Sequence, residues 1–195
     1  MSKLFRYGGL VASVVLIVFG IASIGIGAAG RDTVLDNLAA EKIVGSPDMT
    51  PSAIAAEVKA ANLKNVDLPT CSVAGETVDT GQEARCFSQY MRIHALEATG
   101  GQVYAEMGRY LDKNGQATND ENAAAMDPKS GRPVENGARN IWVNETALST
   151  ALNTSYFAEN VALFSIVMGI ALLLTGVGFL VLTLGLLRRP ARAAA

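Results

Sequence analysis

Residues 161–187 read VALFSIVMGIALLLTGVGFLVLTLGLL and contain no charged side chain. A helix of this length is about 40 Å long, whereas the hydrocarbon core of a bilayer is about 30 Å thick. The stretch therefore predicts a transmembrane helix with room for tilt. What precedes it in the chain must lie on one side of the membrane or cross it again.

A second apolar run lies near the N-terminus, where residues 7–30 carry no charge. Two interpretations are open for it. Lys3 and Arg6 before the run and the small residues 27–29 at its end are typical of a secretory signal. The apolar core, residues 10–29, is however longer than the roughly 7–15 residues of a cleaved signal. We therefore favour an uncleaved transmembrane helix.

The charges are divided sharply along the chain. The ends carry only basic side chains, while the central part, residues 31–159, holds 11 basic and 18 acidic ones and has a net charge of −7. Basic residues close to a span favour the cytoplasm, so we expect both termini inside and the acidic centre outside. An acidic exterior also argues against nucleic acid as a partner. The expected divisions are a cytoplasmic N-terminus (1–7), a first transmembrane helix (8–30), an extracytoplasmic helical domain (31–159), a second transmembrane helix (160–187) and a cytoplasmic tail (188–195).

Small residues recur every seven positions in both apolar runs. Such a stripe lets another helix approach closely with left-handed packing. If the two spans are antiparallel neighbours, Gly20 would lie level with Gly176. Two other interpretations remain open: glycine is common in membrane helices, and a homodimer could use the same stripes. The residues concerned are Ser13, Gly20 and Gly27 in the first run, which would face Thr183, Gly176 and Gly169 in the second.

The central part shows helical periodicity and no alternating strand pattern longer than four residues, so we expect an all-α fold with helical extensions of both spans. Thr50 and Pro51 are typical of an N-cap and a first helical position. Gly100 and Gly101 are typical of a helix end. The expected helices cover residues 31–43, 51 to about 62, 82–99 with Phe87, Met91, His94 and Ala95 on its apolar face, a short helix over 103–111, and 138 onward into the second span, with a long exposed loop over 116–137.

The chain has two cysteines, Cys71 and Cys86, and both fall in the part expected outside. An oxidising compartment favours a disulfide between them; two free buried cysteines are the alternative. A metal site is not expected, because the only histidine is His94 and no CxxC pair is present.

No catalytic constellation emerges from the sequence. One histidine is too few for a two-histidine, one-carboxylate iron site, and there is no GxSxG or phosphate-binding motif. The spans hold no ionisable side chain for an ion path. We interpret His94 as a hydrogen-bonded packing residue. Glu97 and Tyr90 are within reach on a helix for a structural hydrogen bond or a pH-sensitive contact. We therefore expect a protein that is not an enzyme and has no cofactor.

A set of short motifs resembles a family of actinobacterial membrane proteins with two transmembrane helices. The resemblance implies the two-span topology, the exterior placement of the centre and a bacterial plasma membrane; it implies no mechanism. Some members carry an aromatic ring-opening dioxygenase label, which the single histidine does not fit. The motifs are RDTV at 31–34, EKI at 41–43, VDTG at 78–81, AR at 84–85, His94, GG at 100–101, Tyr104 and NETAL at 144–148.

These features favour a non-catalytic membrane protein that acts as an accessory or scaffold partner of a larger cell-envelope complex. Its expected partners are the lipid bilayer and another membrane protein or a second copy of itself. The alternative is an extracytoplasmic module that binds or senses a small molecule or lipid. Its pocket would be lined by Phe87, Met91, His94, Val103 and Tyr104.

Overall fold

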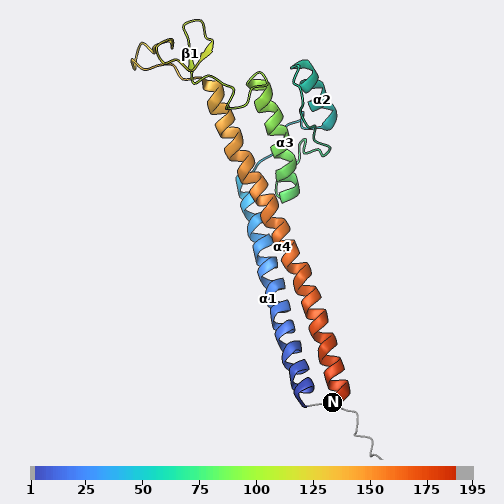
Figure 1. Cartoon of the computed structure of the whole chain (residues 1–195). Coiled ribbons are helices and arrows are strands. Elements are labelled where there is room, and N and C mark those ends of the chain that lie inside the picture. The colour runs from blue at the N-terminus through green and yellow to red at the C-terminus, as the bar shows by residue number, and fades with distance from the viewer. Residues whose placement is uncertain (1–2, 188–195) are drawn as a thin grey trace, which may run out of the picture. The chain divides into compact units, whose positions relative to one another are not determined.

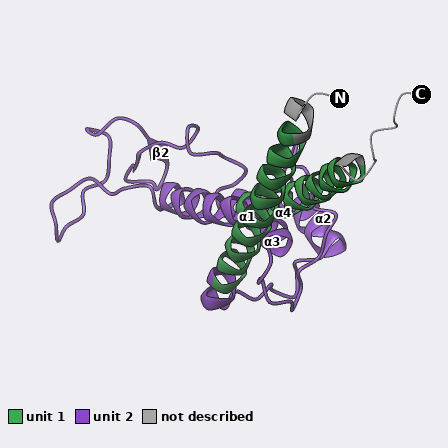
Figure 2. Ribbon diagram, turned by 90° about the horizontal axis from the view of Figure 1, so that it is seen from below, with its two compact units in different colours: residues 1–36, 157–195 green, residues 37–156 purple. Residues whose placement is uncertain are grey.

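The computed structural model describes residues 3–187, so the expected cytoplasmic tail lies outside the described residues. The chain is mostly helical and divides into two compact units, shown in Figure 2. Unit 1 combines residues 1–36 with 157–195, and unit 2 is residues 37–156. The elements, labelled in Figure 1, are α1 (Lys3–Glu41), α2 (Pro51–Ala60), α3 (Gly81–Ala98), β1 (Tyr110–Leu111), β2 (Ala117–Thr118) and α4 (Gly137–Leu187).

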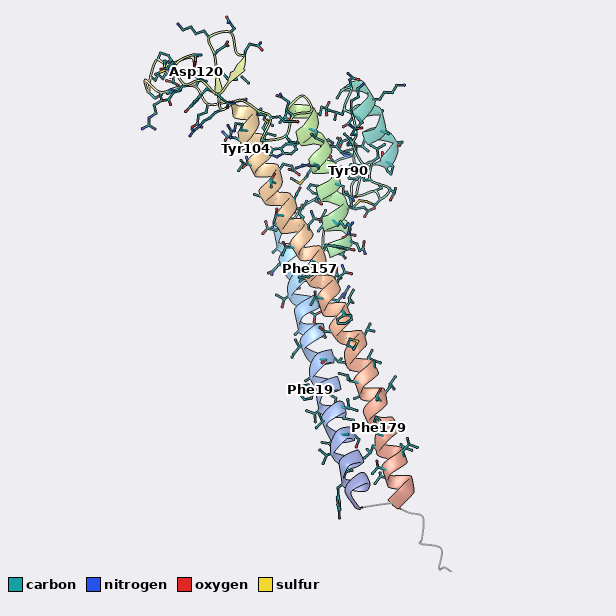
Figure 3. All side chains as sticks on the ribbon, viewed as in Figure 1. Phe19, Tyr90, Tyr104, Asp120, Phe157 and Phe179 are labelled. Atoms are coloured by element: carbon teal, nitrogen blue, oxygen red, sulfur yellow. A yellow bond between two sulfur atoms is a disulfide. The ribbon has the colours of Figure 1, made fainter. Side chains whose placement is uncertain are left out.

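Unit 1 contains the two apolar runs, and both lie in helices long and apolar enough to cross a membrane. In the most apolar stretch of each helix only 11% and 17% is buried. A core helix of a soluble protein would be mostly buried. Large apolar side chains such as Phe19, Phe157 and Phe179, labelled in Figure 3, are 62%, 67% and 46% exposed. The outward surfaces of both helices are therefore apolar.

The small residues of both stripes are buried, and the glycines among them lie against the backbone of the other helix, α1 or α4. A Cβ added to Gly20 would lie 2.8 Å from the carbonyl oxygen of Gly169 and 2.7 Å from the backbone nitrogen of Leu173. The backbones are thus as close as glycine allows. The six stripe residues, all buried, are Ser13, Gly20, Gly27, Gly169, Gly176 and Thr183.

The register expected for these stripes is wrong. Gly20 faces Gly169 and not Gly176, and Gly176 instead meets Ile17, whose backbone nitrogen would lie 2.9 Å from an added Cβ. Isoleucine side chains fill the space beside the glycines, as Ile24 does at Gly169. Glycines placed level with each other would leave voids, and interiors avoid voids because unfilled space loses dispersion contacts.

Charged residues at the end of the apolar runs also join α1 to α4. Arg31 Nε donates to Glu159 Oε1 at 3.1 Å, and the Glu159 side chain is only 8% exposed. Arg31 directly follows Gly30, and Glu159 is two residues before Val161. The pair therefore lies where the two uncharged stretches end.

The first two helices of unit 2 begin where their capping residues predict. Thr50 accepts a hydrogen bond from the backbone N–H of Ala53 and Pro51 is the first residue of α2. Thr80 and Glu83 form a complete capping box at the start of α3, in which each side chain accepts from the other residue's backbone N–H. The TGQE sequence at residues 80–83 carries this signal, and α3 begins at Gly81, one residue before the expected start.

A core between α2, α3 and the intervening loop anchors unit 2, and the disulfide Cys71–Cys86 ties it together, as expected. The hydroxyl of Tyr90 donates to the carbonyl oxygen of Cys71 at 2.6 Å. The expected apolar face of α3 is shifted, because Tyr90 and Ile93 are fully buried while Phe87 is half-buried. The buried residues of this core are Met49, Ile54, Val73, Cys86, Tyr90 and Ile93.

The short helix expected over 103–111 is absent, and β1 there pairs with β2 in an antiparallel hairpin. Gly108 helps explain the difference. A Cβ at Gly108 would lie 2.5 Å from the backbone nitrogen of Thr118, so the two backbones touch in a way that only glycine permits. Leu111 N–H also donates to the carbonyl oxygen of Val134 at 3.0 Å. This N–H is therefore not available for a hydrogen bond within a helix.

α4 begins at Gly137, one residue before the expected start, and continues unbroken to Leu187. Its first part packs on α3 through polar contacts. Arg92 Nη1 donates to Glu145 Oε2 at 3.0 Å, and its guanidinium stacks 3.9 Å from the centre of the Trp142 ring. Asn153 donates to the hydroxyl oxygen of Ser88 at 3.2 Å. Two helices distant in sequence are thus held side by side.

Candidate functional site

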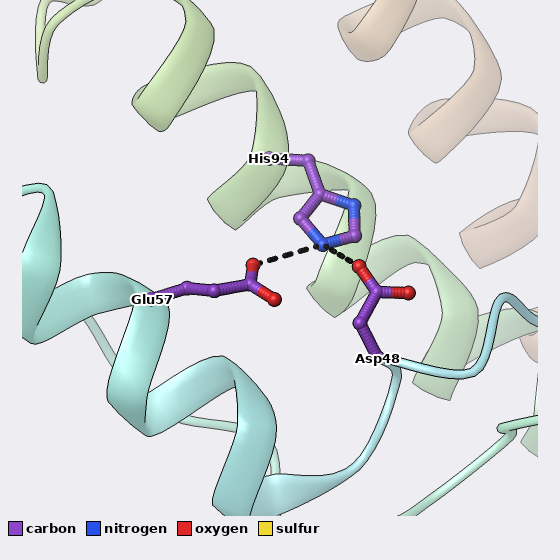
Figure 4. Close-up of side chains that lie close together, drawn as sticks. All are labelled: Asp48, Glu57 and His94. Atoms are coloured by element: carbon purple, nitrogen blue, oxygen red, sulfur yellow. Dashed lines mark ion pairs between the residues drawn. The ribbon is translucent and has the colours of Figure 1, made fainter.

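Three ligand-type side chains converge in unit 2 from three segments, as Figure 4 shows. Asp48 lies in the turn before α2, Glu57 lies on α2, and His94 lies on α3. His94 Nε2 is 3.2 Å from Asp48 Oδ2 and 3.5 Å from Glu57 Oε2. One oxygen from each carboxylate and the imidazole nitrogen all lie within 4.8 Å of one another.

The residues next to the cluster fix its position. Met49 directly follows Asp48 and is 4% exposed. Ile93 directly precedes His94 and is 1% exposed. Ile54, one helical turn before Glu57, is fully buried in the same core. Each of the three side chains therefore projects from backbone that the core holds rigid.

Ser46 orients one carboxylate of the cluster. Its hydroxyl donates a hydrogen bond to Asp48 Oδ1, so that Oδ2 is the oxygen that faces His94. This hydrogen bond is the main reason that the pKa of Asp48 lies below its ordinary value; burial raises it, and a backbone hydrogen bond and the charge of His94 lower it. The carboxylate form is thus favoured.

The imidazole nitrogen in the middle of the cluster is buried but not hydrogen-bonded. Among the residues that the structure describes, His94 Nε2 has no hydrogen-bond partner. The two carboxylate oxygens are near enough for ion pairs, but neither lies where an Nε2–H would meet it in a hydrogen bond. A buried polar atom without such a partner requires an explanation.

The structure gives His94 different neighbours from those we expected. The Tyr90 hydroxyl donates to Cys71 instead, and Glu97 is exposed. The partners that it does have, Asp48 and Glu57, come from segments 46 and 37 positions away. No periodicity in the sequence marks that contact, because it depends on how α2 packs on α3.

The side chains expected to line a ligand pocket are distributed over unit 2. Phe87 packs on the α2–α3 core, whereas Val103 packs on a separate cluster with Met107 and Trp142. Tyr104 is 41% exposed and lies 4.1 Å from the guanidinium of Arg139. Met91 and His94 are half-buried on α3.

No known family model, curated protein or solved structure matches the chain. Interpretation of the site therefore depends on its own chemistry. The cluster offers one imidazole and two carboxylates, which can exchange protons or bind a cation, and it contains no nucleophile of the hydroxyl or thiol type among its three members.

Proposed function

We propose that this chain is a non-catalytic integral membrane protein of a bacterial plasma membrane, with both termini in the cytoplasm and unit 2 outside. The observation that carries the proposal is the distribution of side-chain size on α1 and α4. Their small residues are buried against each other, while their large apolar residues are exposed. That arrangement is typical of membrane helices, which pack through small residues and present large apolar ones to lipid.

Two further features support this placement. The disulfide Cys71–Cys86 lies in unit 2 and favours an oxidising compartment. The Arg31–Glu159 pair stands where the uncharged runs end, as expected for charges at a membrane boundary rather than within it. α1 and α4 would then form an antiparallel transmembrane hairpin with helical extensions on the outer side.

We further propose that unit 2 is an accessory or scaffold element of a larger envelope complex. Ile141 and Leu148 lie seven positions apart on one face of α4, outside the apolar run, and are 42% and 55% exposed. Leu152, four residues further on, is buried. An exposed apolar edge on a helix beyond the lipid would suit a contact with another membrane protein.

The test is native purification in mild detergent, followed by mass spectrometry of the proteins that co-purify. We expect a reproducible membrane-protein partner that an Ile141→Asn/Leu148→Asn variant loses. An Asn140→Ala variant, changed at a neighbouring exposed position, should retain it. Recovery of the wild-type chain alone, or only with copies of itself, would contradict the accessory function.

One observation favours the alternative of a ligand-binding or sensing module, namely the His94 cluster. It brings three possible ligand atoms together at side chains that are 29–39% exposed. A small ligand could therefore reach it from solvent.

A further inference from the structure

We propose that Asp48, Glu57 and His94 form a binding site for a divalent first-row transition-metal ion, with Zn²⁺ as the best fit. The inference goes beyond the accessory function and is independent of it. It also replaces our expectation that the chain has no metal site. That expectation depended on counting histidines and cysteines, and it left out carboxylates that the fold brings to His94 from other segments.

The distances between the donor atoms agree with tetrahedral coordination. Zn²⁺ binds imidazole nitrogen and carboxylate oxygen at about 2.0–2.2 Å, which places neighbouring donor atoms about 3.3–3.5 Å apart. The imidazole nitrogen of His94 lies 3.2 Å from the Asp48 oxygen and 3.5 Å from the Glu57 oxygen. The third pair, between the two carboxylates, lies within 4.8 Å. Two of the three donor pairs therefore already have about the spacing that a tetrahedral ion needs.

The second observation is the buried nitrogen at the centre. His94 Nε2 has less than 1 Å² of exposed surface and no hydrogen-bond partner among the described residues. A neutral imidazole would point its Nε2 lone pair at two carboxylates, which donate nothing, whereas a protonated ring would form ion pairs with them but no hydrogen bond. A cation between the three atoms would satisfy the nitrogen and both oxygens together.

The chemistry of the donors selects the class of metal. Imidazole suits zinc, iron, nickel and copper, whereas calcium and magnesium take oxygen ligands. Two carboxylates together balance the charge of a divalent ion. Three protein ligands at partly exposed side chains leave a fourth position open to water, so the ion should exchange with solvent.

The groups around the ligands also resemble those around metal sites. Metal-binding carboxylates are usually held by further hydrogen bonds, and Ser46 holds Asp48 in this way. The neighbours of the ligands, Met49 and Ile93, are core residues. A bound ion would clamp the turn before α2, α2 itself and α3 to one another.

The test uses the full-length chain purified without a histidine tag, depleted of metal by a chelator and dialysed against Zn²⁺. Metal content is then measured by mass spectrometry and affinity by calorimetry. We expect one Zn²⁺ per chain, with Mg²⁺ in excess unable to compete. Failure to retain Zn²⁺, or displacement by Mg²⁺, would overturn the proposal.

Isosteric variants separate loss of the site from loss of the fold. Asp48→Asn, Glu57→Gln and His94→Gln should each weaken Zn²⁺ binding by at least about tenfold, while the Cys71–Cys86 disulfide and the Trp142 fluorescence remain as in the wild type. Glu97→Gln, on the same helix but exposed, is the matched control and should bind as the wild type does. Equal binding by the wild type and the triple variant would place the ion elsewhere and contradict the site.

Ser46→Ala tests the positioning of Asp48. We expect about tenfold weaker Zn²⁺ binding with the stoichiometry unchanged, because Ser46 orients a ligand and is not one itself. An unchanged affinity would show that the hydrogen bond from Ser46 does not position Asp48 for binding.

Discussion

Glu145 shows how one buried charge is accommodated in unit 2. Its side chain is 4% exposed, and it receives hydrogen bonds from Arg92, from Thr146 and from Ser149 at 2.8–3.3 Å. A buried carboxylate is tolerated only when such donors replace water. The residue therefore fixes α4 against α3 through specific bonds rather than through apolar contact.

We expect Glu145→Ala to lower the free energy of unfolding of unit 2 by about 2 kcal/mol, because the hydrogen bonds that this charged acceptor receives from Arg92, Thr146 and Ser149 are lost. Trp142 is the chain's only tryptophan and lies beside Arg92, so its fluorescence during denaturant unfolding measures the change. Glu97→Ala, at an exposed carboxylate, is the control. Equal midpoints for the two variants would show that the hydrogen bonds to Glu145 contribute nothing to stability.

Tyr90 should make unit 2 sensitive to alkaline pH. Burial raises the pKa of its hydroxyl above the ordinary value of 10.0. The folded state then keeps the proton at pH values where the unfolded chain has lost it. The stability from Tyr90 is therefore complete below about pH 10 and declines as the pH rises toward the folded-state pKa.

The comparison with Tyr90→Phe isolates this effect. At neutral pH we expect the variant to be about 1 kcal/mol less stable, because the hydrogen bond to the Cys71 carbonyl is lost. Above pH 10 the difference should shrink, since only the wild type has this hydroxyl to ionise. Denaturation midpoints followed by Trp142 fluorescence between pH 8 and pH 11 measure it. A difference that stays constant over the whole range would contradict the argument.

At the scale of elements, local signals predict helix starts well. Thr50 with Pro51 locates α2, and the uninterrupted sequence after Gly137 locates α4. The helix predicted from the apolar residues around 103–111 is wrong, because a hairpin uses the same backbone groups. Gly108 touches backbone ten residues away, and that contact has no local signature.

The register of α1 on α4 provides a sharp test of the helix pair. A Cβ added to Gly9 would lie 3.8 Å from Cβ of Thr183, which is within the range of disulfides. We expect a Gly9→Cys/Thr183→Cys variant to form an intramolecular crosslink on mild oxidation, detected by mass spectrometry of the linked peptides. The Ser13→Cys/Thr183→Cys variant, which matches the register expected from the sequence, should crosslink less. The reverse order would overturn the observed register.

Glycine itself is required at only some positions of α1. Gly20→Ala places a methyl group within 2.8 Å of backbone atoms of α4, whereas Gly25→Ala meets nothing within 4 Å. We expect Gly20→Ala to destabilise the helix pair by about 1–3 kcal/mol, because backbone atoms cannot move aside as a flexible side chain would. Gly25→Ala is the matched control and should be neutral. Thermal stability of the full chain in detergent measures both, and equal values would show that α1 and α4 do not pack through this stripe.

At the scale of the whole molecule, the candidate site could not be predicted from the sequence. His94 was identified as a single residue, but its partners Asp48 and Glu57 depend on the packing of α2 on α3. That packing depends in turn on Ile54 and on the disulfide loop. A pattern along one helix reveals neighbours at three or four positions, and it cannot reveal a donor 46 positions away.

The charge partition determines the expected orientation in the membrane, and cysteine labelling tests it. Translocating the acidic centre while retaining the basic ends satisfies the positive-inside bias. With the native cysteines bridged, an Asp120→Cys variant places a single thiol in unit 2, at the position labelled in Figure 3. We expect a membrane-impermeant maleimide to label it on intact spheroplasts. A Ser2→Cys variant should react only after permeabilisation, because the N-terminus is expected inside. Labelling of both variants in intact spheroplasts would place the termini outside, and labelling of neither before permeabilisation would place unit 2 in the cytoplasm.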